Sequence, residues 1–443
     1  MVGLNPARTT IETAPAPTKA WRSTHHIAMN AFYDELEQRS PAQREADLLA
    51  ALPAQVAHAQ AHSEAFGQIL AGVDARQITT REALAQLPVT RKSELHERQQ
   101  AERARHAFGG FASIGFGPHM PRVFASPGPI YEPEGTRRDY WRMARAMYAA
   151  GFRSGELIHN CFSYHFVPAG SMMETGAHAL GCTVFPGGTG QTEQQVQAMA
   201  ELRPAGYIGT PSFLKIIVEK AAEMGVALPS MTKAMLGGEA FPPSLRDWLA
   251  ERGIHAYQCF ATADLGLIAY ETAAREGLVL EEQVIVEIVR PGTGDPVAPG
   301  EVGELVVTSL NPDYPLIRFG TGDLTAILPG PCPTGRTNTR IKGWMGRADQ
   351  TTKVRGMFVH PSQVAQVLKR FPQLGRGRLV VSGEMANDQM TLKVEADNAS
   401  LELAQQLGDA VREVTKLRAA IEWAAPHSLP NDGKVIEDAR SYR

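Results

Sequence analysis

Between residues 136 and 260, helical patterns alternate with short apolar strands. Helices are expected at about 137–151, 170–180, 192–202, 212–224 and 242–252, and strands at about 157–161, 182–185, 206–209, 234–236 and 255–260. This alternation is typical of a parallel sheet with helices on its faces. Ligands collect at the carboxyl ends of such strands, so we expect a site in the loops after Cys161, Leu236 and Phe260.

The flanking regions follow other patterns. A chain of 443 residues exceeds the ~250–300 residues at which one core stops growing, so two or more domains are expected. Residues 1–100 are predicted to be mainly helical. After Ala273, strands joined by Gly/Pro turns predict a β-rich antiparallel subdomain, and a β-α-β-β-α order follows Gly346. The predicted fold is α/β: a large N-terminal domain, residues 1–348, with mostly parallel sheets, and a small C-terminal α+β domain, residues 349–443.

Composition excludes several classes of protein. The formal net charge of −3 provides no basic surface for nucleic acid or an acidic membrane. No apolar run approaches the ~18 residues that cross a bilayer, and the first thirty residues lack the apolar core of a signal peptide. The four cysteines are scattered without a C-x-x-C pair. We therefore expect a cytoplasmic protein with reduced cysteines and no bound structural metal.

Two short motifs indicate chemistry, although each has a simpler explanation. Gly237-Gly238-Glu239 ends a predicted strand, and two glycines would let a flat ring approach the backbone closely, but they would also serve a turn. Asp323 could accept hydrogen bonds from two ribose hydroxyls, although an Asp after Gly often forms a turn.

The order of several motifs along the chain is more informative than any one of them. These segments are Leu87-Pro88-Val89-Thr90-Arg91-Lys92, Phe108-Gly109-Gly110-Phe111, His159-Asn160 with Tyr164, Gly209-Thr210-Pro211-Ser212, Gly237-Gly238-Glu239, residues 315–324, Gly346-Arg347-Ala348-Asp349 with Lys353 and Gly356, and residues 429–434. In this order they resemble the adenylate-forming superfamily, most closely the phenylacetate-CoA ligase family of acyl-CoA synthetases. The resemblance covers almost the whole chain after the first ~25 residues.

The resemblance implies a nucleotide site. Gly237, Gly238 and Glu239 would lie along the adenine, and Asp323 would hold the ribose hydroxyls. Arg347 would lie close to the nucleotide.

The resemblance also implies a mobile C-terminal domain. Asp349 would be the hinge about which this domain rotates, and Lys434 would enter the site during adenylation. A lysine suits that role because its point charge can meet the oxygens on which charge builds up. A solvated lysine near the chain end is the alternative. His159, Tyr164 and His165 would line the acyl pocket or the CoA path, although a histidine beside an apolar strand is more often a core or rim residue.

The chain departs from the family at its phosphate loop, Ser-Ser-Gly-Thr-Thr-Gly-x-Pro. The matching segment is Ser126-Pro127-Gly128-Pro129-Ile130-Tyr131-Glu132-Pro133, in which only Ser126, Gly128 and the last proline persist. The prolines lack an N–H, and Glu132 adds a negative charge beside the expected triphosphate.

A second departure falls in the family's Tyr-Gly-x-Thr-Glu motif. Here it reads Phe260-Ala261-Thr262-Ala263-Asp264. Phe260 and Ala261 stand at positions where the resemblance implies contacts with the nucleotide. Asp264 keeps the carboxylate that helps to hold Mg²⁺, while Thr262 is the one hydroxyl that could replace the lost threonine.

The resemblance therefore implies an acid–CoA ligase. It would use ATP, Mg²⁺ and CoA to form an acyl-adenylate from an aryl or arylacetic acid and pass the acyl group to CoA, as a monomer or homodimer. The altered loop leaves a second hypothesis open, a non-ligating relative that binds AMP, acyl-AMP or CoA as an assembly subunit or acyltransferase. A third is adenylation with a carrier protein or an amine as acceptor.

Overall fold

The computed structural model describes residues 31–290, 293–348, 350, 352–383, 387–430 and 435–440. The segment Phe32–Arg443 forms one compact unit. In the described part of the chain, no helix is long and apolar enough to cross a membrane.

The largest sheet has nine strands in the order β14-β15-β10-β9-β8-β7-β6-β4-β5. Its parallel part consists of β5 (Thr183–Phe185), β4 (Leu157–Asn160), β6 (Gly206–Gly209), β7 (Lys233–Leu236) and β8 (His255–Thr262). The helices that connect these strands are α6 (Ala169–Leu180), α7 (Thr192–Leu202), α8 (Pro211–Glu223) and α9 (Pro243–Ala250), and α5 (Ala144–Ala149) precedes them. The predicted parallel sheet is confirmed.

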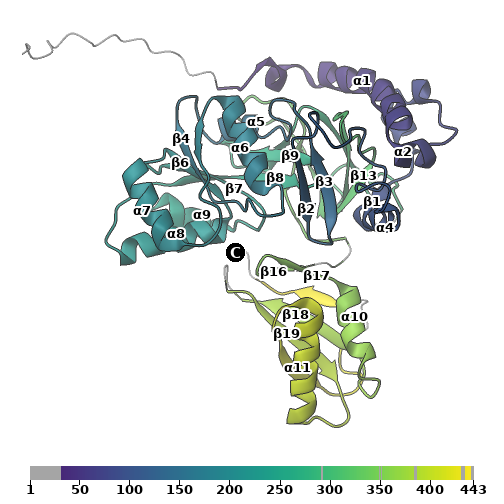
Figure 1. Cartoon of the computed structure of the whole chain (residues 1–443), viewed down its shortest axis with the longest axis vertical. Coiled ribbons are helices and arrows are strands. Elements are labelled where there is room, and N and C mark those ends of the chain that lie inside the picture. The colour runs from purple at the N-terminus through teal and green to yellow at the C-terminus, as the bar shows by residue number, and fades with distance from the viewer. Residues whose placement is uncertain are drawn as a thin grey trace, which may run out of the picture. The chain divides into compact units, whose positions relative to one another are not determined.

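Strand periodicity explains the layers on either side of this sheet. Successive side chains of a strand point to opposite faces. Ile208 and Met235 therefore join the core beneath α5 and α6, whereas Tyr207 and Leu236 join the core beneath α7, α8 and α9. Both helical layers are visible in Figure 1. The strand ends are thus held between two separate cores.

An antiparallel region continues this sheet through β9 (Gly266–Glu271), β10 (Leu278–Leu280), β15 (Arg340–Ile341) and β14 (Ile327–Leu328). A second sheet has the order β1 (Thr90–Arg91), β13 (Phe319–Thr325), β12 (Gly303–Ser309) and β11 (Val284–Val289). The predicted β-rich region is confirmed. The hairpin of β2 (Arg122–Ser126) and β3 (Ile130–Glu134) carries the altered phosphate loop and was not anticipated.

The segment before β1 is helical, as predicted, from residue 35 onward. It comprises η1 (Glu35–Gln38), α1 (Pro41–His62), α2 (Glu64–Ile69), η2 (Ala75–Gln77) and α3 (Arg81–Ala85), and α4 (Lys92–Glu102) follows β1. The Ser40 hydroxyl caps α1 by accepting from the Gln43 amide, and Pro41 occupies the first helical position. Leu48, Leu52 and Val56 of α1 reach the core at helical spacing.

Two predicted elements were wrong in extent. The helix expected at 137–151 is reduced to α5, because Asp139 and Arg142 have φ of 52° and 63°, outside the helical region. The strand expected at 354–359 is a hairpin of β16 (Thr352–Val354) and β17 (Met357–Val359), since Arg355 and Gly356 form a turn with φ of 48° and 82°.

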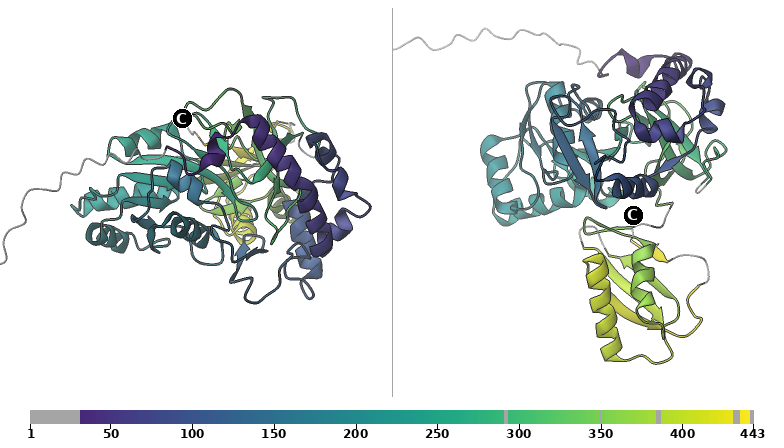
Figure 2. Two further views of the ribbon diagram at one scale, coloured as in Figure 1. Left: turned by 90° about the horizontal axis from the view of Figure 1, so that it is seen from above. Right: turned by 45° about the vertical axis from the view of Figure 1, so that its right-hand side comes forward.

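The C-terminal segment has a core of its own. A sheet in the order β20 (Ala420–Ala424), β19 (Gln389–Glu395), β18 (Gly377–Ser382) and β21 (Ile436–Asp438) packs with α10 (Pro361–Lys369) and α11 (Leu401–Thr415). Leu379 opposes Leu392 in the register, and both face this core. Figure 2 shows the segment in green and yellow. The predicted α+β order is confirmed, whereas β20 and β21 were not predicted.

Candidate active site

The loops after β4, β6 and β7, in the region where we expect a site, lie close together. Gly237 and Gly238 follow β7, and a Cβ on Gly237 would lie 2.9 Å from Cys259 Sγ in β8. A Cβ on Gly238 would lie 3.6 Å from Cε1 of Phe162, which follows β4, and 3.8 Å from Cγ2 of Thr210, which follows β6. Gly238 also has a φ of +78°, which glycine adopts without strain. The glycines thus form a wall without side chains where four strands end.

Polar groups line this wall. The Ser212 hydroxyl donates to Glu239 Oε1 at 2.5 Å, and Lys353 Nζ donates to the Gly238 carbonyl at 2.6 Å. Burial lowers the pKa of Lys353, and the charge of Glu239 opposes that shift. Lys353 matched the motif series, but the sequence provided no role for it.

Asp323 and Arg347, the expected ribose and nucleotide contacts, lie side by side. They form an isolated antiparallel bridge, and Arg347 Nη1 donates to Asp323 Oδ1 at 3.0 Å. The Trp344 indole donates to the same oxygen at 3.1 Å. Gly322 has a φ of +73°, and a Cβ there would lie 2.5 Å from Arg347 Nη2. The backbone conformation favours glycine here, and a larger residue would push the Arg347 guanidinium aside. Asp349 and Lys434 lie outside the described residues.

A partly buried ion pair lies at the start of α4. Lys92 Nζ lies 2.7 Å from Asp264 Oδ2, and the Asp264 side chain is 0% exposed. Burial opposes the charged form of Lys92, but the carboxylates of Asp264 and Glu132 outweigh it and raise its pKa. Asp264 Oδ1 is buried and has no hydrogen-bond partner among the described residues. The role of Lys92 was missed, although the lysine ends the first motif of the series.

Glu132 turns inward from the altered phosphate loop. It is 0% exposed, and its Oε2 accepts from the Ser126 amide at 3.1 Å. The Ser126 hydroxyl donates to its Oε1. Burial and the charge of Asp264 raise the pKa of Glu132 to about 8, while Lys92 opposes the shift. The carboxyl group that was expected to face the triphosphate is instead held by the loop itself.

The remaining residues of the second altered motif lie in and after β8. Phe260 pairs with Ala269 of β9, and Ala261 pairs with Leu267, with a register shift between the two pairs. The Thr262 hydroxyl accepts from the Leu265 amide at 3.1 Å. This turn places Asp264 beside Lys92.

The three residues expected along the acyl or CoA path have different surroundings. His159 is fully buried, its Nε2 lies 2.6 Å from Gln195 Oε1, and burial lowers its pKa. The half-buried Tyr164 donates its hydroxyl hydrogen to Glu174 Oε2 at 2.8 Å, whereas His165 is exposed. These contacts do not join the three side chains to one another.

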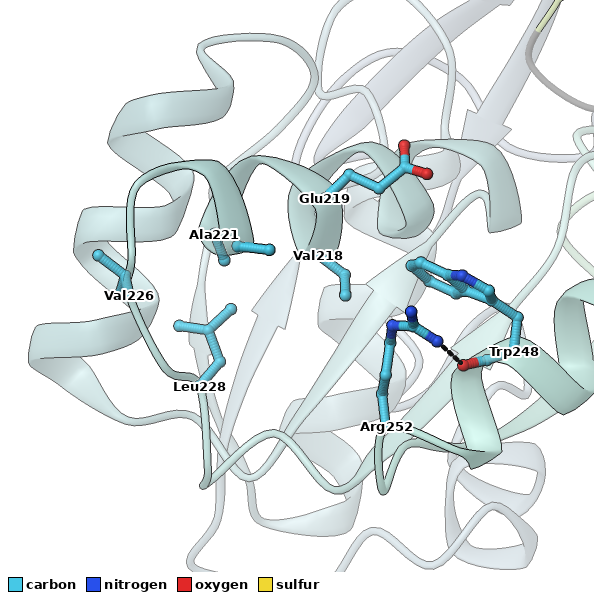
Figure 3. Close-up of a pocket in the computed structure, with 8 residues that line it drawn as sticks. Val218, Glu219, Ala221, Val226, Leu228, Trp248 and Arg252 are labelled. Carbon is cyan, nitrogen blue, oxygen red and sulfur yellow. Dashed lines mark hydrogen bonds between the residues drawn. The ribbon is translucent and has the colours of Figure 1, made fainter.

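A cavity of about 350 Å³ lies elsewhere, between the C-terminal ends of α8 and α9. Figure 3 shows Val218 and Leu228 on one side and Trp248 and Arg252 on the other, with the Arg252 guanidinium donating to the Trp248 carbonyl. These helix ends precede β7 and β8, so the cavity lies at the amino ends of these strands. The glycine wall lies at the carboxyl end of β7.

All four cysteines are free and buried. Burial raises the pKa of Cys259 to about 12, as expected for a small buried thiol. Cys332 contacts the hydroxyls of Thr272 and Thr334. In the described ranges, no group of three or more His, Cys, Asp or Glu residues could hold a metal ion.

Comparison with known proteins agrees with this arrangement. Residues 136–311 match the model of the AMP-binding enzyme family, and residues 356–439 match that of the AMP-binding enzyme C-terminal domain. The phenylacetate-coenzyme A ligase of Thermus thermophilus is 33% identical over 83% of this chain and 85% of its own length. The one from Pseudomonas putida is 31% identical over 79% and 81%.

A solved structure covers the same extent. The 2-hydroxyisobutyryl-CoA ligase in complex with 2-HIB-AMP and CoA, in the thioesterification state, has a TM-score of 0.79, 25% identity and 94% coverage of both chains. From the matched family models, the extent of these relatives and the shared fold, the chain belongs to the phenylacetate-coenzyme A ligase family of AMP-binding enzymes.

Proposed function

We propose that the protein is an acid–CoA ligase that forms an acyl-adenylate from ATP and a carboxylic acid and then transfers the acyl group to CoA. The relatives named above are phenylacetate-coenzyme A ligases, and the solved relative holds an adenylate together with CoA. The observation that carries the proposal is the Asp323–Arg347 pair, 3.0 Å apart, together with the wall of Gly237 and Gly238 at the strand ends.

Each part of this nucleotide site has a physical role. The wall of Gly237 and Gly238 lets adenine lie against the backbone, and Glu239 borders it. The Asp323 carboxylate accepts from Trp344 and Arg347, and a carboxylate is the acceptor that ribose hydroxyls need. The Arg347 guanidinium next to it can meet phosphate oxygens.

Asp264 fits the expected Mg²⁺ ion. Mg²⁺ in nucleotide sites is bound by one or two carboxylates together with substrate phosphates. Asp264 offers Oδ1, a buried oxygen without a hydrogen-bond partner in the described part of the chain. When bound, the ion would neutralise charge on phosphate oxygens, while Lys92 fixes the orientation of the carboxylate through Oδ2.

Further parts of the proposal rest on the family. Lys434 would meet the charge that develops in adenylation, and Asp349 would be the hinge between domains at 1–348 and 349–443. The separate core of the C-terminal segment supports this division. We also propose an aryl or arylacetic acid as substrate, a cytoplasmic location and a monomer or homodimer.

The test is ATP–pyrophosphate exchange and thioester formation with a panel of aryl and arylacetic acids. Wild type should form the thioester with at least one acid, and Lys434→Ala and Asp323→Ala should each lower the rate. Omitting CoA and offering an amine or a carrier protein tests the other acceptors. The proposal is wrong if no acid produces either signal above the Lys434→Ala background.

A further inference from the structure

The loop that should hold the pyrophosphate part of ATP has little left to offer an anion. Among residues 126–131, Pro127 and Pro129 have no amide hydrogen. The Ser126 amide and hydroxyl both donate to Glu132. The Tyr131 amide donates to Gln99 Oε1 at 2.8 Å, and the Gln99 side-chain amide donates back to the Tyr131 carbonyl at 2.8 Å. At most two further backbone amides of this loop remain.

Glu132 thus takes up two donors that a loop of this kind would offer to an anion. Loops of this kind hold phosphate through backbone amides and hydroxyls, and Glu132 engages one of each from Ser126. Its carboxyl group is fully buried and lies within the electrostatic reach of Lys92 and Asp264. Both its oxygens are engaged with Ser126, so the loop is closed on itself.

Binding of a pyrophosphate group here would therefore cost free energy. The group would have to displace Glu132 from Ser126 and leave a buried carboxyl group without its partners, which is more costly than losing an exposed hydrogen bond. It would also add negative charge beside Asp264. The nearby cation Lys92 is already paired with Asp264 at 2.7 Å. A nucleotide that ends at its α-phosphate would meet none of these obstacles.

We infer that Glu132 is a specificity-determining residue that makes this site select adenylates over nucleoside triphosphates. The inference rests on the proposed function and deepens it: the thioester half-reaction is fast, and the ATP-dependent half-reaction limits the enzyme. In the thioester step the CoA sulfur bonds to the acyl carbon. The bond from that carbon to the phosphate oxygen breaks, AMP leaves with the electron pair, and the thiol proton passes to solvent. This step requires no pyrophosphate site.

The first test measures binding of AMP and of α,β-methylene-ATP to the full-length protein by calorimetry. Wild type should bind the triphosphate analogue at least about tenfold more weakly than AMP, because one charge-assisted hydrogen bond accounts for about that factor. Glu132→Ala frees the Ser126 donors and should bring the two affinities together, with AMP binding changed less than about twofold. Glu132→Gln keeps an occupant but has only one acceptor oxygen for the two Ser126 donors, so it should fall between them.

The second test compares thioester formation from supplied phenylacetyl-AMP with formation from phenylacetate and ATP. Wild type should be at least about tenfold faster from the adenylate, and Glu132→Ala should raise the rate at low ATP. The inference is overturned if the triphosphate analogue binds wild type as tightly as AMP. It is also overturned if neither folded variant changes the ratio of the two affinities. Absence of any thioester from phenylacetate and ATP, and of any pyrophosphate exchange, would overturn the proposed function instead, whether or not the supplied adenylate reacts. If Glu132→Ala does not fold, the affinity ratio of wild type and its change in Glu132→Gln test the inference.

Discussion

Replacing Arg318 should destabilise the protein more than replacing any surface arginine. Arg318 is 2% exposed and uses all its donors. Its Nε and Nη2 donate to the two oxygens of Glu287, each at 3.0 Å. Its remaining N–H groups donate to the backbone carbonyls of Gly294 at 2.7 Å, Ala85 at 2.8 Å and Leu87. One side chain thus joins three segments of the chain.

The magnitude follows from what Arg318→Met leaves behind. The Glu287 carboxylate would stay buried without its cation, and breaking a buried ion pair in this way costs about 3–5 kcal/mol. The double variant Arg318→Met/Glu287→Leu removes the unpaired charge as well, and it should recover a large part of that loss. Three carbonyls remain without donors in both variants, so recovery should be incomplete.

Urea unfolding followed by circular dichroism measures these differences. Arg370→Met is the matched control, because Arg370 also donates two hydrogen bonds to a glutamate, Glu413, but both side chains are exposed, at 38% and 66%. Loss of such an exposed pair should change the free energy of unfolding little. The reasoning is refuted if Arg318→Met loses less than about 1 kcal/mol, or if the double variant is less stable than the single one.

Three other predictions concern the nucleotide site. Glu132 has a pKa raised from 4.5 to about 8, so the folded protein retains a proton that the unfolded chain loses, and stability should fall as pH rises through that window, by on the order of a few kcal/mol. Thermal melting from pH 5 to 9 should show this fall in wild type and a flatter profile in Glu132→Gln; parallel profiles would contradict it. Gly322→Ala should weaken AMP binding at least about tenfold, since its Cβ would clash with Arg347 Nη2 at 2.5 Å; unchanged affinity in calorimetry would show that Arg347 does not contact the nucleotide. Asp323→Asn should raise the Kd for AMP more than for 2′,3′-dideoxy-AMP, and equal effects would argue against a ribose contact.

Local signals in the sequence predicted much of the fold. The helix at 192–202 and the strand at 206–209 match α7 and β6 at both ends, because helical periodicity and a bounding Gly or Thr mark those ends clearly. The helix expected at 137–151 was wrong because of a local side-chain contact. The Asp139 carboxylate accepts from the amides of Met143 and Ala144 at 2.8 and 3.0 Å and so starts the helix late.

The candidate site was predictable only in part. Asp323 and Arg347 could be identified because each belongs to a motif with a known order. Lys92 and Asp264 are 172 positions apart, and nothing local to either one indicates their ion pair. The departure of the phosphate loop from the family motif was visible in its amino-acid sequence. The inward orientation of Glu132 was not, since it depends on the hairpin register that brings Glu132 opposite Phe124 and on burial.

The buried contacts of η1 have a consequence for protein synthesis. Glu37 is 1% exposed, and its Oε1 accepts from the Tyr270 hydroxyl and the Arg336 guanidinium, 233 and 299 positions later. At 5–20 residues per second, the ribosome would need roughly 15–60 s after making Glu37 before Arg336 appears. Until Arg336 is made, Glu37 lacks one of its buried partners, although the strands that the N-terminal helices pack against precede that residue. Nascent chains stalled before residue 336 should therefore be cut by protease at η1 more readily than released full-length chains.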